Sequence, residues 1–290
     1  MSYRIEKNEA LSAALGRIAA EEIALAMSEL RRRNRAQAMH NTRKSLKRLR
    51  SLLRSLRVAF PGQIFRRENR RLAAAGRKIA PLRDVHVQLR ALGKLPASNA
   101  AAKRIQQNLL RQQEACTRKI PALRRAVRQM LSASRETFAA LAPGRATPED
   151  LTRGLQRVYK RGRAALKAAR RNRTPENLHE WRKQAKTLGH GLDLIERLCS
   201  KKAGTMIQRT EQLCQALGDD HDLFLVLQVL RREDAARPAR DYRRLARLIS
   251  AKRRRLQKEG FKLGRKVFGQ KPGPFGERLQ SWLRRSPSKK

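Results

Sequence analysis

Apolar side chains recur at intervals of three and four residues along almost the whole chain, and this spacing restricts the fold to helices. The segments that carry it are dominated by Ala, Leu, Arg, Lys, Gln and Glu, which are good helix formers. No stretch alternates apolar and polar residues for long, as a half-buried β-strand would. We therefore expect an all-α protein.

The clearest example of this spacing lies between residues 39 and 60. Its apolar or small residues fall on one helix face and form a seam of the kind that packs against other helices: Met39, Thr42, Leu46, Leu49, Leu53, Leu56 and Phe60. A second seam with similar spacing follows in the later part of the chain: Leu178, Trp181, Ala185, Leu188, Leu192 and Ile195.

Proline and glycine residues divide the chain into expected helices. We place these helices at residues 8–33, 37–60, 63–80, 82–94, 99–142, 148–171, 176–199, 203–217, 221–233 and 239–268. Pro121 is expected to kink or split the long helix over 99–142. Thr174 and Pro175 suit the N-cap and first helical position of the helix that follows them, with Asn177 at the third.

Two motifs occur twice in the same order and at nearly the same offset, which indicates an internal duplication. His40, Arg43, Lys44 and Lys47 match His179, Arg182, Lys183 and Lys186. Further along, the segment Arg83-Asp84-Val85 lines up with His221-Asp222-Leu223. We therefore predict a duplicated bundle unit with halves at residues 1–143 and 147–268, followed by a flexible basic tail at 269–290.

The charge of the chain is the second strong constraint. It has 70 Lys and Arg against 24 Asp and Glu, a formal net charge of +46. Self-repulsion of this size destabilises a compact state unless counter-charge is near, so an anionic partner is expected. Disorder is the alternative for so charged a chain, but 40% of the residues are hydrophobic and they fall at helical spacing. This patterning favours a folded and positively charged body.

Three cysteines (Cys116, Cys199 and Cys214) form no CxxC pair. Their number and spacing argue against a disulfide framework or a zinc site and suit a reducing cytosol. The first residues do not resemble a signal peptide, and the longest apolar run is too short to span a bilayer. We therefore expect a soluble, cytoplasmic protein that does not insert into membranes.

A stripe of cations lies one residue beyond the first seam: His40, Arg43, Lys47, Arg50, Arg54 and Arg57, widened by Lys44 and Arg48. Such a run is often only a solvated helix face. Here there are almost no acidic residues three or four positions away, so the stripe is not an internal salt-bridge lattice. Neighbouring cations would repel within the Debye length of about 10 Å. This pattern favours anion binding.

The second helix carries a shorter stripe, at His179, Arg182, Lys183 and Lys186, which ends at Gly189 and His190. Together, the two stripes resemble the CHAD family, α-helical domains that are known for binding inorganic polyphosphate. The segments Leu82-Arg83-Asp84 and Leu217-Gly218-Asp219 also resemble that family, and the likeness extends to about residue 268. Gly189-His190 departs from it, because the family more typically carries Arg and an aromatic residue there.

The resemblance implies two antiparallel helical bundles, related by a pseudo-twofold axis, whose two histidine-bearing helices line a central basic groove or pore. It also implies inorganic polyphosphate as the partner and an association with polyphosphate granules. The expected polyphosphate-binding residues are His40, Arg43, Lys44, Lys47, Arg48, Arg50, Arg54, His179, Arg182, Lys183 and Lys186. No cofactor is expected.

Lys would supply point charges and Arg forked donors to phosphate oxygens. His40 and His179 have two open interpretations. They donate to phosphate and strengthen binding when protonated below about pH 6.5, or they form a cap or an inter-helix hydrogen bond.

An enzyme of phosphate chemistry is disfavoured, since phosphoryl transfer usually needs metal-binding carboxylates or a Walker loop. No GxxxxGK[ST] motif occurs, and the only dense acidic patch is Asp219-Asp220-His221-Asp222. We expect that patch to lie at the positive N-terminus of a helix and to pair with Lys or Arg, as Asp84 would in the first half.

A nucleic-acid backbone binder is the serious alternative, because any basic groove attracts phosphates. Proteins that bind single strands usually stack bases on aromatic rings. Only 4% of the residues are aromatic, and none interleaves with the first cation stripe before Phe60. A ligand without bases fits this composition better.

Overall fold

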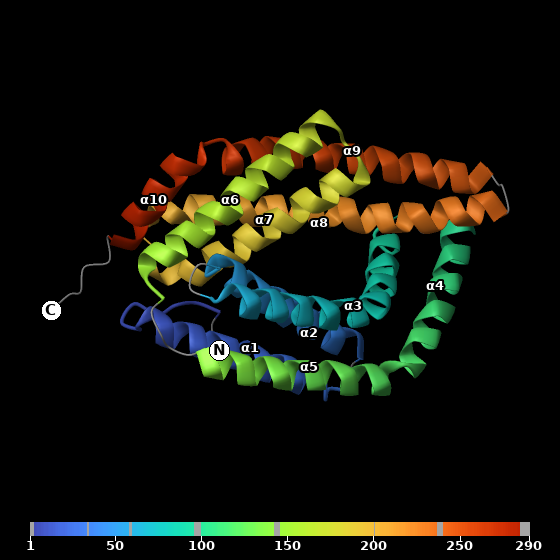
Figure 1. The fold of residues 1–290 in the computed structure, drawn as a ribbon. Coiled ribbons are helices and arrows are strands. Elements are labelled where there is room, and N and C mark those ends of the chain that lie inside the picture. The colour runs from blue at the N-terminus through green and yellow to red at the C-terminus, as the bar shows by residue number, and fades with distance from the viewer. Residues whose placement is uncertain are drawn as a thin grey trace.

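The structure is a computed structural model that describes residues 3–33, 35–57, 60–95, 100–141, 146–199, 201–236 and 240–284. Within these ranges the protein consists of α-helices and one short 3-10 helix, with no strand, as predicted (Figure 1). The helices are α1 (Leu11–Glu29), α2 (Arg35–Ser55), α3 (Gly62–Leu92), α4 (Ala100–Arg118), α5 (Ile120–Leu141), α6 (Pro148–Arg171), α7 (Pro175–Ile195), η1 (Glu196–Leu198), α8 (Lys201–Ala236), α9 (Arg240–Phe268) and α10 (Pro272–Arg284).

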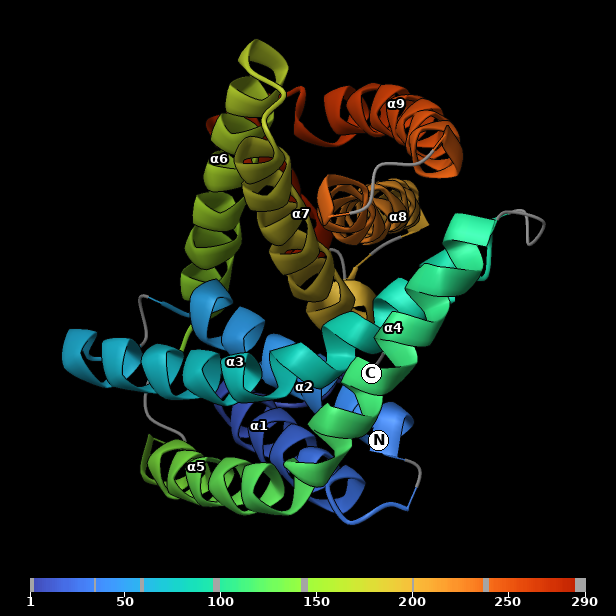
Figure 2. The same cartoon turned by 90° about the vertical axis from the view of Figure 1, so that its right-hand side faces the viewer.

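Helices α1–α5 gather on one side of the molecule and α6–α10 on the other (Figures 1 and 2). Each group repeats most of the same packing order. In the first, α1 contacts α2 and α5, and α2 contacts α3; in the second, α6 contacts α7 and α10, and α7 contacts α8. The groups meet where α2 packs on α6 and α7 and where α3 packs on α8. Helix α2 therefore runs along the junction, facing its counterpart α7.

The two groups share one hydrophobic core rather than burying separate ones. Its members include the seam residues Met39, Leu46, Leu49 and Leu53 of α2, Leu56 directly after α2, and the whole predicted seam of α7, from Leu178 to Ile195. The spacing of three and four residues thus predicted both buried faces correctly. Because each seam points into the shared core, the cation stripe beside it turns toward the other group of helices.

Close backbone packing fixes the junction at the end of α2. A Cβ atom added to Gly154 of α6 would lie 1.6 Å from the carbonyl oxygen of Ser55. At Gly191 of α7, an added Cβ would lie 2.4 Å from Leu155 Cδ2 and 3.2 Å from Ser55 Oγ. Gly154 admits only a hydrogen atom against this backbone, and at Gly191 a methyl group would require Leu155 to move, so glycine at these positions lets α2, α6 and α7 converge.

The predicted signal for the start of α7 is confirmed. Thr174 accepts a hydrogen bond from the Asn177 backbone N–H and Pro175 begins α7. At the start of α6, Thr147 and Asp150 form a reciprocal capping box.

Two of the expected helix breaks are wrong. Pro81 lies inside α3 and Gly218 lies inside α8. In Figure 1, α3 changes direction and its last part runs toward α8, so the proline bends the helix instead of ending it. Gly218 has open space around its Cα, and a single glycine lowers helix propensity without breaking a helix. At Pro121 the expected division is confirmed, because α4 ends at Arg118 and α5 begins at Ile120.

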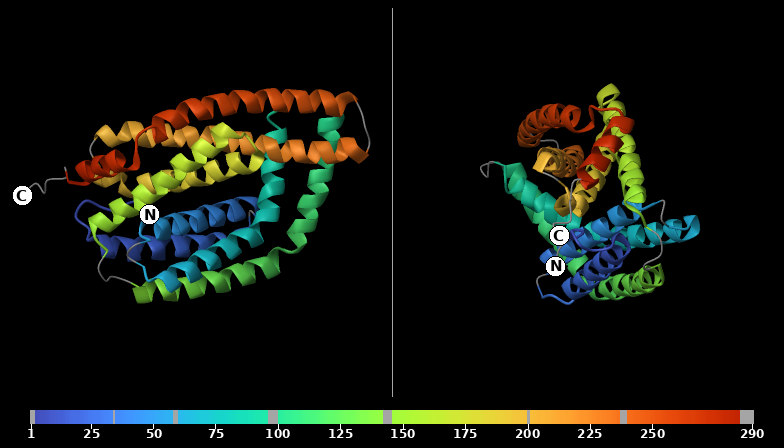
Figure 3. Two further views of the ribbon diagram at one scale, coloured as in Figure 1. Left: turned by 45° about the horizontal axis from the view of Figure 1, so that its top comes forward. Right: turned by 90° about the vertical axis from the view of Figure 1, so that its left-hand side faces the viewer.

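The expectation of a flexible tail over 269–290 is wrong for residues 272–284, which form α10 (Figure 3). Phe275, Leu279 and Trp282 are buried in the shared core, and the ring of Phe275 stacks on Tyr159 of α6 at a centroid distance of 3.8 Å. The segment Pro272-Gly273-Pro274 begins this helix, because proline suits the first helical turn. Residues 285–290 lie outside the described residues.

A second, smaller core closes the end of the molecule where α8 and α9 run together (Figure 3). It joins the last turns of α3 to α4, the C-terminal half of α8 and the first turns of α9. None of the described helices is both long enough and apolar enough to cross a lipid bilayer.

Candidate functional site

A cavity of about 220 Å³ lies between α2 and α7, and we refer to it as the central cavity. Its lining comes from both cation stripes: Arg43, Lys47, Arg50, Ser51 and Arg54 of α2, and His179, Arg182, Lys183, Lys186, Thr187 and His190 of α7. Seven of these side chains are Lys or Arg, and none of the described lining residues is acidic. The fold thus brings the two predicted stripes, far apart in sequence, to one site.

Lys47 is the most perturbed cation of the α2 wall. Burial lowers its pKa well below the ordinary value, and repulsion from Arg182, Arg43, Arg83 and Lys186 lowers it further. No described carboxylate lies within ion-pair distance of its ammonium group. The protein therefore holds a partly buried ammonium among like charges, an arrangement that an anion in the cavity would relieve.

The arginines on either side of Lys47 are held in place by neutral groups. Arg43 donates to the carbonyl oxygen of Gly76 at 2.9 Å, and its buried Nε has no hydrogen-bond partner. Arg50 donates to Asn69 Oδ1 at 3.2 Å, and burial together with repulsion from Arg54 lowers the pKa of Arg50 to about 10. Both guanidinium groups are positioned without being neutralised.

Arg54 joins the two walls directly. Its guanidinium donates to Thr187 Oγ1 on α7 at 3.1 Å. Burial lowers the pKa of Arg54, and repulsion from Arg161 of α6 lowers it further. A cation of a third helix therefore influences this end of the central cavity.

The α7 wall has the same character. Arg182 is only 7% exposed and its Nε has no hydrogen-bond partner. Burial lowers the pKa of Arg182 and also that of Lys186, and repulsion from Arg83 contributes to both shifts. Lys183 is the exception on this wall, because it pairs with Glu180 on its own helix.

Further groups come from α3 and α8, beyond the two predicted helices. Arg83 of α3 contributes to the lowered pKa of Lys47 and Arg182 and lies 3.7 Å from Asp222 of α8. The rings of His179 and His221 have centroids 4.8 Å apart, and burial followed by repulsion from Arg182 lowers the pKa of His221 to about 3. Arg83 and His221 belong to the second motif that is repeated in the sequence, but they were not predicted to be part of the site.

Three residues predicted for the site do not line the central cavity. Arg48 pairs with Glu22 of α1 at 2.8 Å, and its guanidinium lies 5.0 Å from the ring centroid of Tyr3. Lys44 and His40 are exposed. Burial and repulsion from Arg90 and Arg83 lower the pKa of His40. One residue along a helix rotates the side chain by about 100°, which turns Lys44 and Arg48 away from Arg43 and Lys47.

The acidic patch lies in the middle of α8 and not at a helix N-terminus, so that part of the expectation is wrong. The predicted pairing with cations is confirmed for Asp220, which accepts from Arg253 Nε at 2.9 Å, and for Asp222, which lies 3.6 Å from Arg90. Asp219 accepts from Gln215. Among the described side chains, no three His, Cys, Asp or Glu residues group as metal ligands would.

In the first half, Asp84 of α3 pairs with the neighbouring Arg83 at 2.9 Å, as predicted.

Comparison with known proteins places this arrangement among solved folds. A family model described as CHAD domain matches residues 9–231. The crystal structure of the CHAD domain from the plant Ricinus communis superposes with a TM-score of 0.59 at 17% identity, covering 97% of this chain and 95% of that one. PptA from Streptomyces chartreusis gives a TM-score of 0.58 at 15% identity, covering 88% of this chain and 96% of that one. At these identities the two structures show the fold alone, and no curated protein matches the sequence.

Proposed function

The chain belongs to the CHAD domain family, and from that premise we propose that it binds inorganic polyphosphate in the central cavity without cleaving it. One observation carries the proposal: seven Lys and Arg side chains from two helices line one cavity that contains no acidic side chain among its described residues. The resemblance of the two stripes to the polyphosphate-binding family names the ligand, and the charge distribution around the cavity supports an anion of high charge density.

The lowered pKa values of the cavity cations favour a bound anion over a helix face that is only solvated. Lys47, Arg182 and Lys186 have lowered pKa values because burial and mutual repulsion disfavour their charged forms. A solvated face would leave these groups in water, where the repulsion is screened. In the cavity, an anion supplies charge-assisted hydrogen bonds to the same groups. An anion therefore gains most from binding beside the cations whose mutual repulsion is strongest in the free protein.

A linear phosphate polymer fits the two walls better than a nucleic acid does. No Phe, Tyr or Trp is among the described residues that line the central cavity, so bases would find no ring on which to stack. A chain of phosphates without bases needs only cations at regular spacing. The walls provide them at Arg43, Lys47 and Arg50 on α2 and at Arg182 and Lys186 on α7.

The carboxylates nearest the cavity suit a binding role rather than catalysis. Glu180 is paired with Lys183, and Asp222 lies beside Arg83 and Arg90. Each therefore balances a cation and is not free to act as a base toward water or a phosphoryl group. The polymer is held by charge and hydrogen bonds and leaves unchanged.

A charge-matched pair of triple variants tests the proposal. In the cavity triple, Lys47, Arg182 and Lys186 are each changed to Gln; in the control triple, Arg243, Arg244 and Arg247 of α9 are changed to Gln. Both variants lose three positive charges, and Arg243, Arg244 and Arg247 are exposed.

We expect the cavity triple to bind long-chain polyphosphate at least about tenfold more weakly, which is about 1.4 kcal/mol. The control triple should stay within about twofold of the wild type, on the same scale. Calorimetric titration at one salt concentration measures both, and circular dichroism checks that helicity is retained. Equal losses would mean that total charge governs binding and would reject the central cavity as the site.

Competition experiments separate polyphosphate from the alternative of a nucleic-acid backbone. Labelled polyphosphate is displaced by unlabelled polyphosphate, RNA or double-stranded DNA at equal phosphate concentration and fixed salt. Polyphosphate should compete best. Stronger displacement by either nucleic acid would favour the alternative function.

The proposal includes a cytoplasmic location at polyphosphate granules, as the family resemblance implies. Imaging a tagged copy in cells with and without polyphosphate synthesis tests it. Foci that disappear when synthesis is abolished would support it, and an unchanged distribution would reject it.

A further inference from the structure

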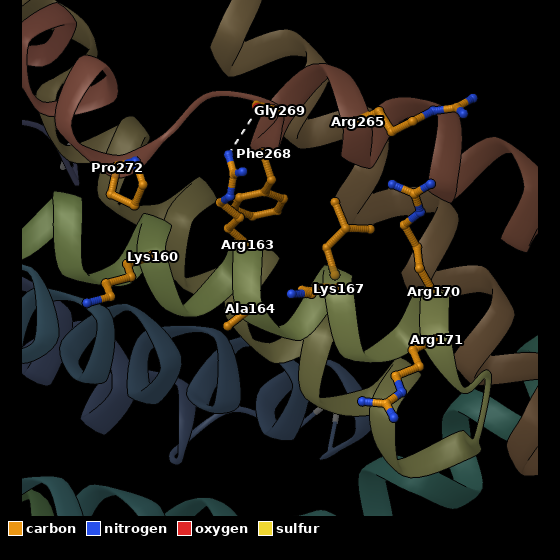
Figure 4. Close-up of a pocket in the computed structure, with 11 residues that line it drawn as sticks. Lys160, Arg163, Ala164, Lys167, Arg170, Arg171, Arg265, Phe268, Gly269 and Pro272 are labelled. Atoms are coloured by element: carbon orange, nitrogen blue, oxygen red, sulfur yellow. Dashed lines mark hydrogen bonds between the residues drawn. The ribbon is translucent and has the colours of Figure 1, made fainter.

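A larger cavity, of about 790 Å³, lies away from the α2–α7 interface, between α6, the end of α9 and the start of α10; we refer to it as the outer cavity (Figure 4). It is lined by Lys160, Arg163, Ala164, Leu166, Lys167, Arg170 and Arg171 of α6, by Arg265 and Phe268 of α9, and by Gly269 and Pro272. Six of these are Lys or Arg, and none of the described lining residues is acidic. Figure 4 shows the cations spread along α6, with Arg265 opposite them on α9.

The cations of α6 have the same spacing in sequence as the cations of the α2 wall. Lys160, Arg163, Lys167 and Arg170 stand three, four and three positions apart, as His40, Arg43, Lys47 and Arg50 do. This spacing places one cation on each helical turn, about 5.4 Å apart along the axis. In the described part of the chain, none of the six lining cations has an ion pair with a carboxylate. We refer to these α6 cations as the ladder, and the absence of described ion pairs means that the ladder is not a salt-bridged surface.

The base of the outer cavity is held in place by hydrogen bonds and close packing. Arg163 donates to the carbonyl oxygen of Gly269 at 3.0 Å and also to that of Gln270, which ties α6 to the segment between α9 and α10. Phe268 is buried at the base, and its ring packs so closely on Gly162 that an added Cβ would lie 2.3 Å from Cε1. The rim cations Lys160, Lys167 and Arg170 remain exposed.

The same helix connects this ladder to the central cavity. Helix α6 packs on α2. Its residue Arg161, which lies about 100° around the helix from Lys160, is the like charge that most disfavours the charged form of Arg54 at the end of the central cavity. A polyanion that extended past Arg54 would therefore come close to α6. The central cavity, at about 220 Å³, is also much smaller than the outer one, at about 790 Å³.

We propose that the outer cavity is a second phosphate-binding site, which holds the part of a long polyphosphate chain that extends beyond the central cavity. This inference rests on the proposed function, because it assigns the second site to the same polymer. Binding at both places by one chain makes the second contact intramolecular and raises the affinity for long chains above that for short ones.

The test uses a third variant, the α6 triple, in which Lys160, Lys167 and Arg170 are changed to Gln. Arg163 is left intact because its hydrogen bonds hold α10 in place. The α6 triple loses three positive charges, the same number as the cavity triple and the control triple. Each protein is titrated with tripolyphosphate, with long-chain polyphosphate and with double-stranded DNA at one salt concentration, after thermal unfolding has confirmed that it is folded.

We expect the α6 triple to bind long chains about tenfold more weakly than the control triple, a loss of about 1.4 kcal/mol. Its affinity for tripolyphosphate should be unchanged. The cavity triple should lose affinity for both ligands. This pattern would support one polymer spanning two sites.

Two results would overturn the inference, and a third would overturn the proposed function instead. If the α6 triple binds long chains as the control triple does, there is no second site, although the central cavity stands. If the α6 triple loses double-stranded DNA binding but keeps long-chain polyphosphate, the outer cavity serves a nucleic acid. If the cavity triple keeps its tripolyphosphate affinity, the central cavity is not the primary site.

Discussion

The buried ammonium group of Lys47 lowers the stability of the free protein, and the same group is available to bind an anion. It stands at the middle of the α2 wall with cations around it and no described carboxylate in range, and its pKa is lowered chiefly by burial. A group whose pKa falls on folding destabilises the native state at every pH below its ordinary value of 10.5, since the folded protein must either hold an unfavourable charge or release a proton that the unfolded chain keeps. That destabilisation disappears as the pH rises above 10.5.

Lys47→Met should therefore stabilise the protein while weakening its function. Removing the ammonium should raise the free energy of unfolding by about 1 kcal/mol at neutral pH, a shift in Tm of about 2–4 °C. The gain should shrink as the pH approaches 10.5, and affinity for polyphosphate should fall. Thermal unfolding over a pH series measures the effect, with the exposed Lys44→Met as control. A Lys47→Met protein that is less stable than the wild type would contradict the assignment of an unpaired, functional cation.

His179 gives the site a second pH dependence. Burial lowers its pKa below 6.5, with repulsion from Arg182 and Lys183 adding to the shift and Glu180 opposing it. The free protein therefore protonates His179 less readily than an ordinary histidine, and a bound phosphate would raise its pKa again. Protonation adds a charge and a donor to the cavity rim.

Affinity for polyphosphate should thus rise as the pH falls from about 7 to about 5, and His179→Gln should flatten that rise. The matched control is His86→Gln, because His86 lies on α3 outside the lining of the central cavity. Titration at several pH values with constant salt measures both variants. If His179→Gln retains the full pH dependence, His179 has a structural role instead.

Among the helices, the crossing of α2 over α6 and α7 sets the separation of the two walls. Gly154 and Gly191 permit this crossing at the end of α2, where Ser55 lies against both helices. Gly218 in α8 is different, since no atom outside its own helix backbone would lie within 4 Å of an added Cβ.

Gly154→Ala and Gly218→Ala should act in opposite directions. The first places a methyl group against the carbonyl oxygen of Ser55 and should destabilise the fold by about 3 kcal/mol. The second removes the conformational freedom of an open helical glycine and should stabilise it by about 1 kcal/mol. Chemical denaturation measures both. Similar stabilities for the two variants would mean that α2 and α6 do not approach so closely.

Helix spacing made much of this architecture predictable from the sequence, because a seam at intervals of three and four residues depends on one helix alone. The seams of α2 and α7 were predicted on that basis, and the start of α7 was predicted from Thr174 and Pro175. The breaks at Pro81 and Gly218 were wrong because tertiary packing carries α3 and α8 across them. Helix α10 was missed because Pro272 was interpreted as a breaker, although the buried Phe275 and Trp282 show that it begins a packed helix.

For the candidate site, the stripes on α2 and α7 could be predicted, but their limits could not. Arg48 was included because it is adjacent to Lys47 in sequence, although Glu22 on another helix decides its orientation. Arg83 and His221 enter through the packing of α3 and α8 around the cavity, which no local pattern specifies. Their place in a repeated motif was the only signal for them.

At the scale of the whole molecule, the charge of +46 makes any polyanion attractive, so specificity must come from where the cations are held. Apart from the pairs of Lys183 with Glu180 and His190 with Asp193, the described ion pairs lie outside the lining of the two cavities, as between Arg17 and Glu9 or Arg253 and Asp220. The other Lys and Arg side chains that line the two cavities have no carboxylate partner among the described residues. The fold thus separates most of the cavity cations from the carboxylates that form ion pairs elsewhere.

Salt dependence should report this separation. Displaced counterions make log K for polyphosphate fall steeply and linearly with log salt concentration, by analogy with single-stranded nucleic acids. The cavity triple removes three contacts and should reduce that slope by about 2, while the control triple should leave it nearly unchanged. Titrations at four or more salt concentrations give the slopes. Equal slopes for the two triples would indicate diffuse attraction without a site.

A crystal structure of the protein with bound polyphosphate tests the central claim most directly. We predict phosphate density between α2 and α7, with oxygen atoms about 2.7–2.9 Å from the nitrogens of Lys47 and Arg182. Density confined to the outer surfaces, with the space between the two walls filled only by water, would contradict it.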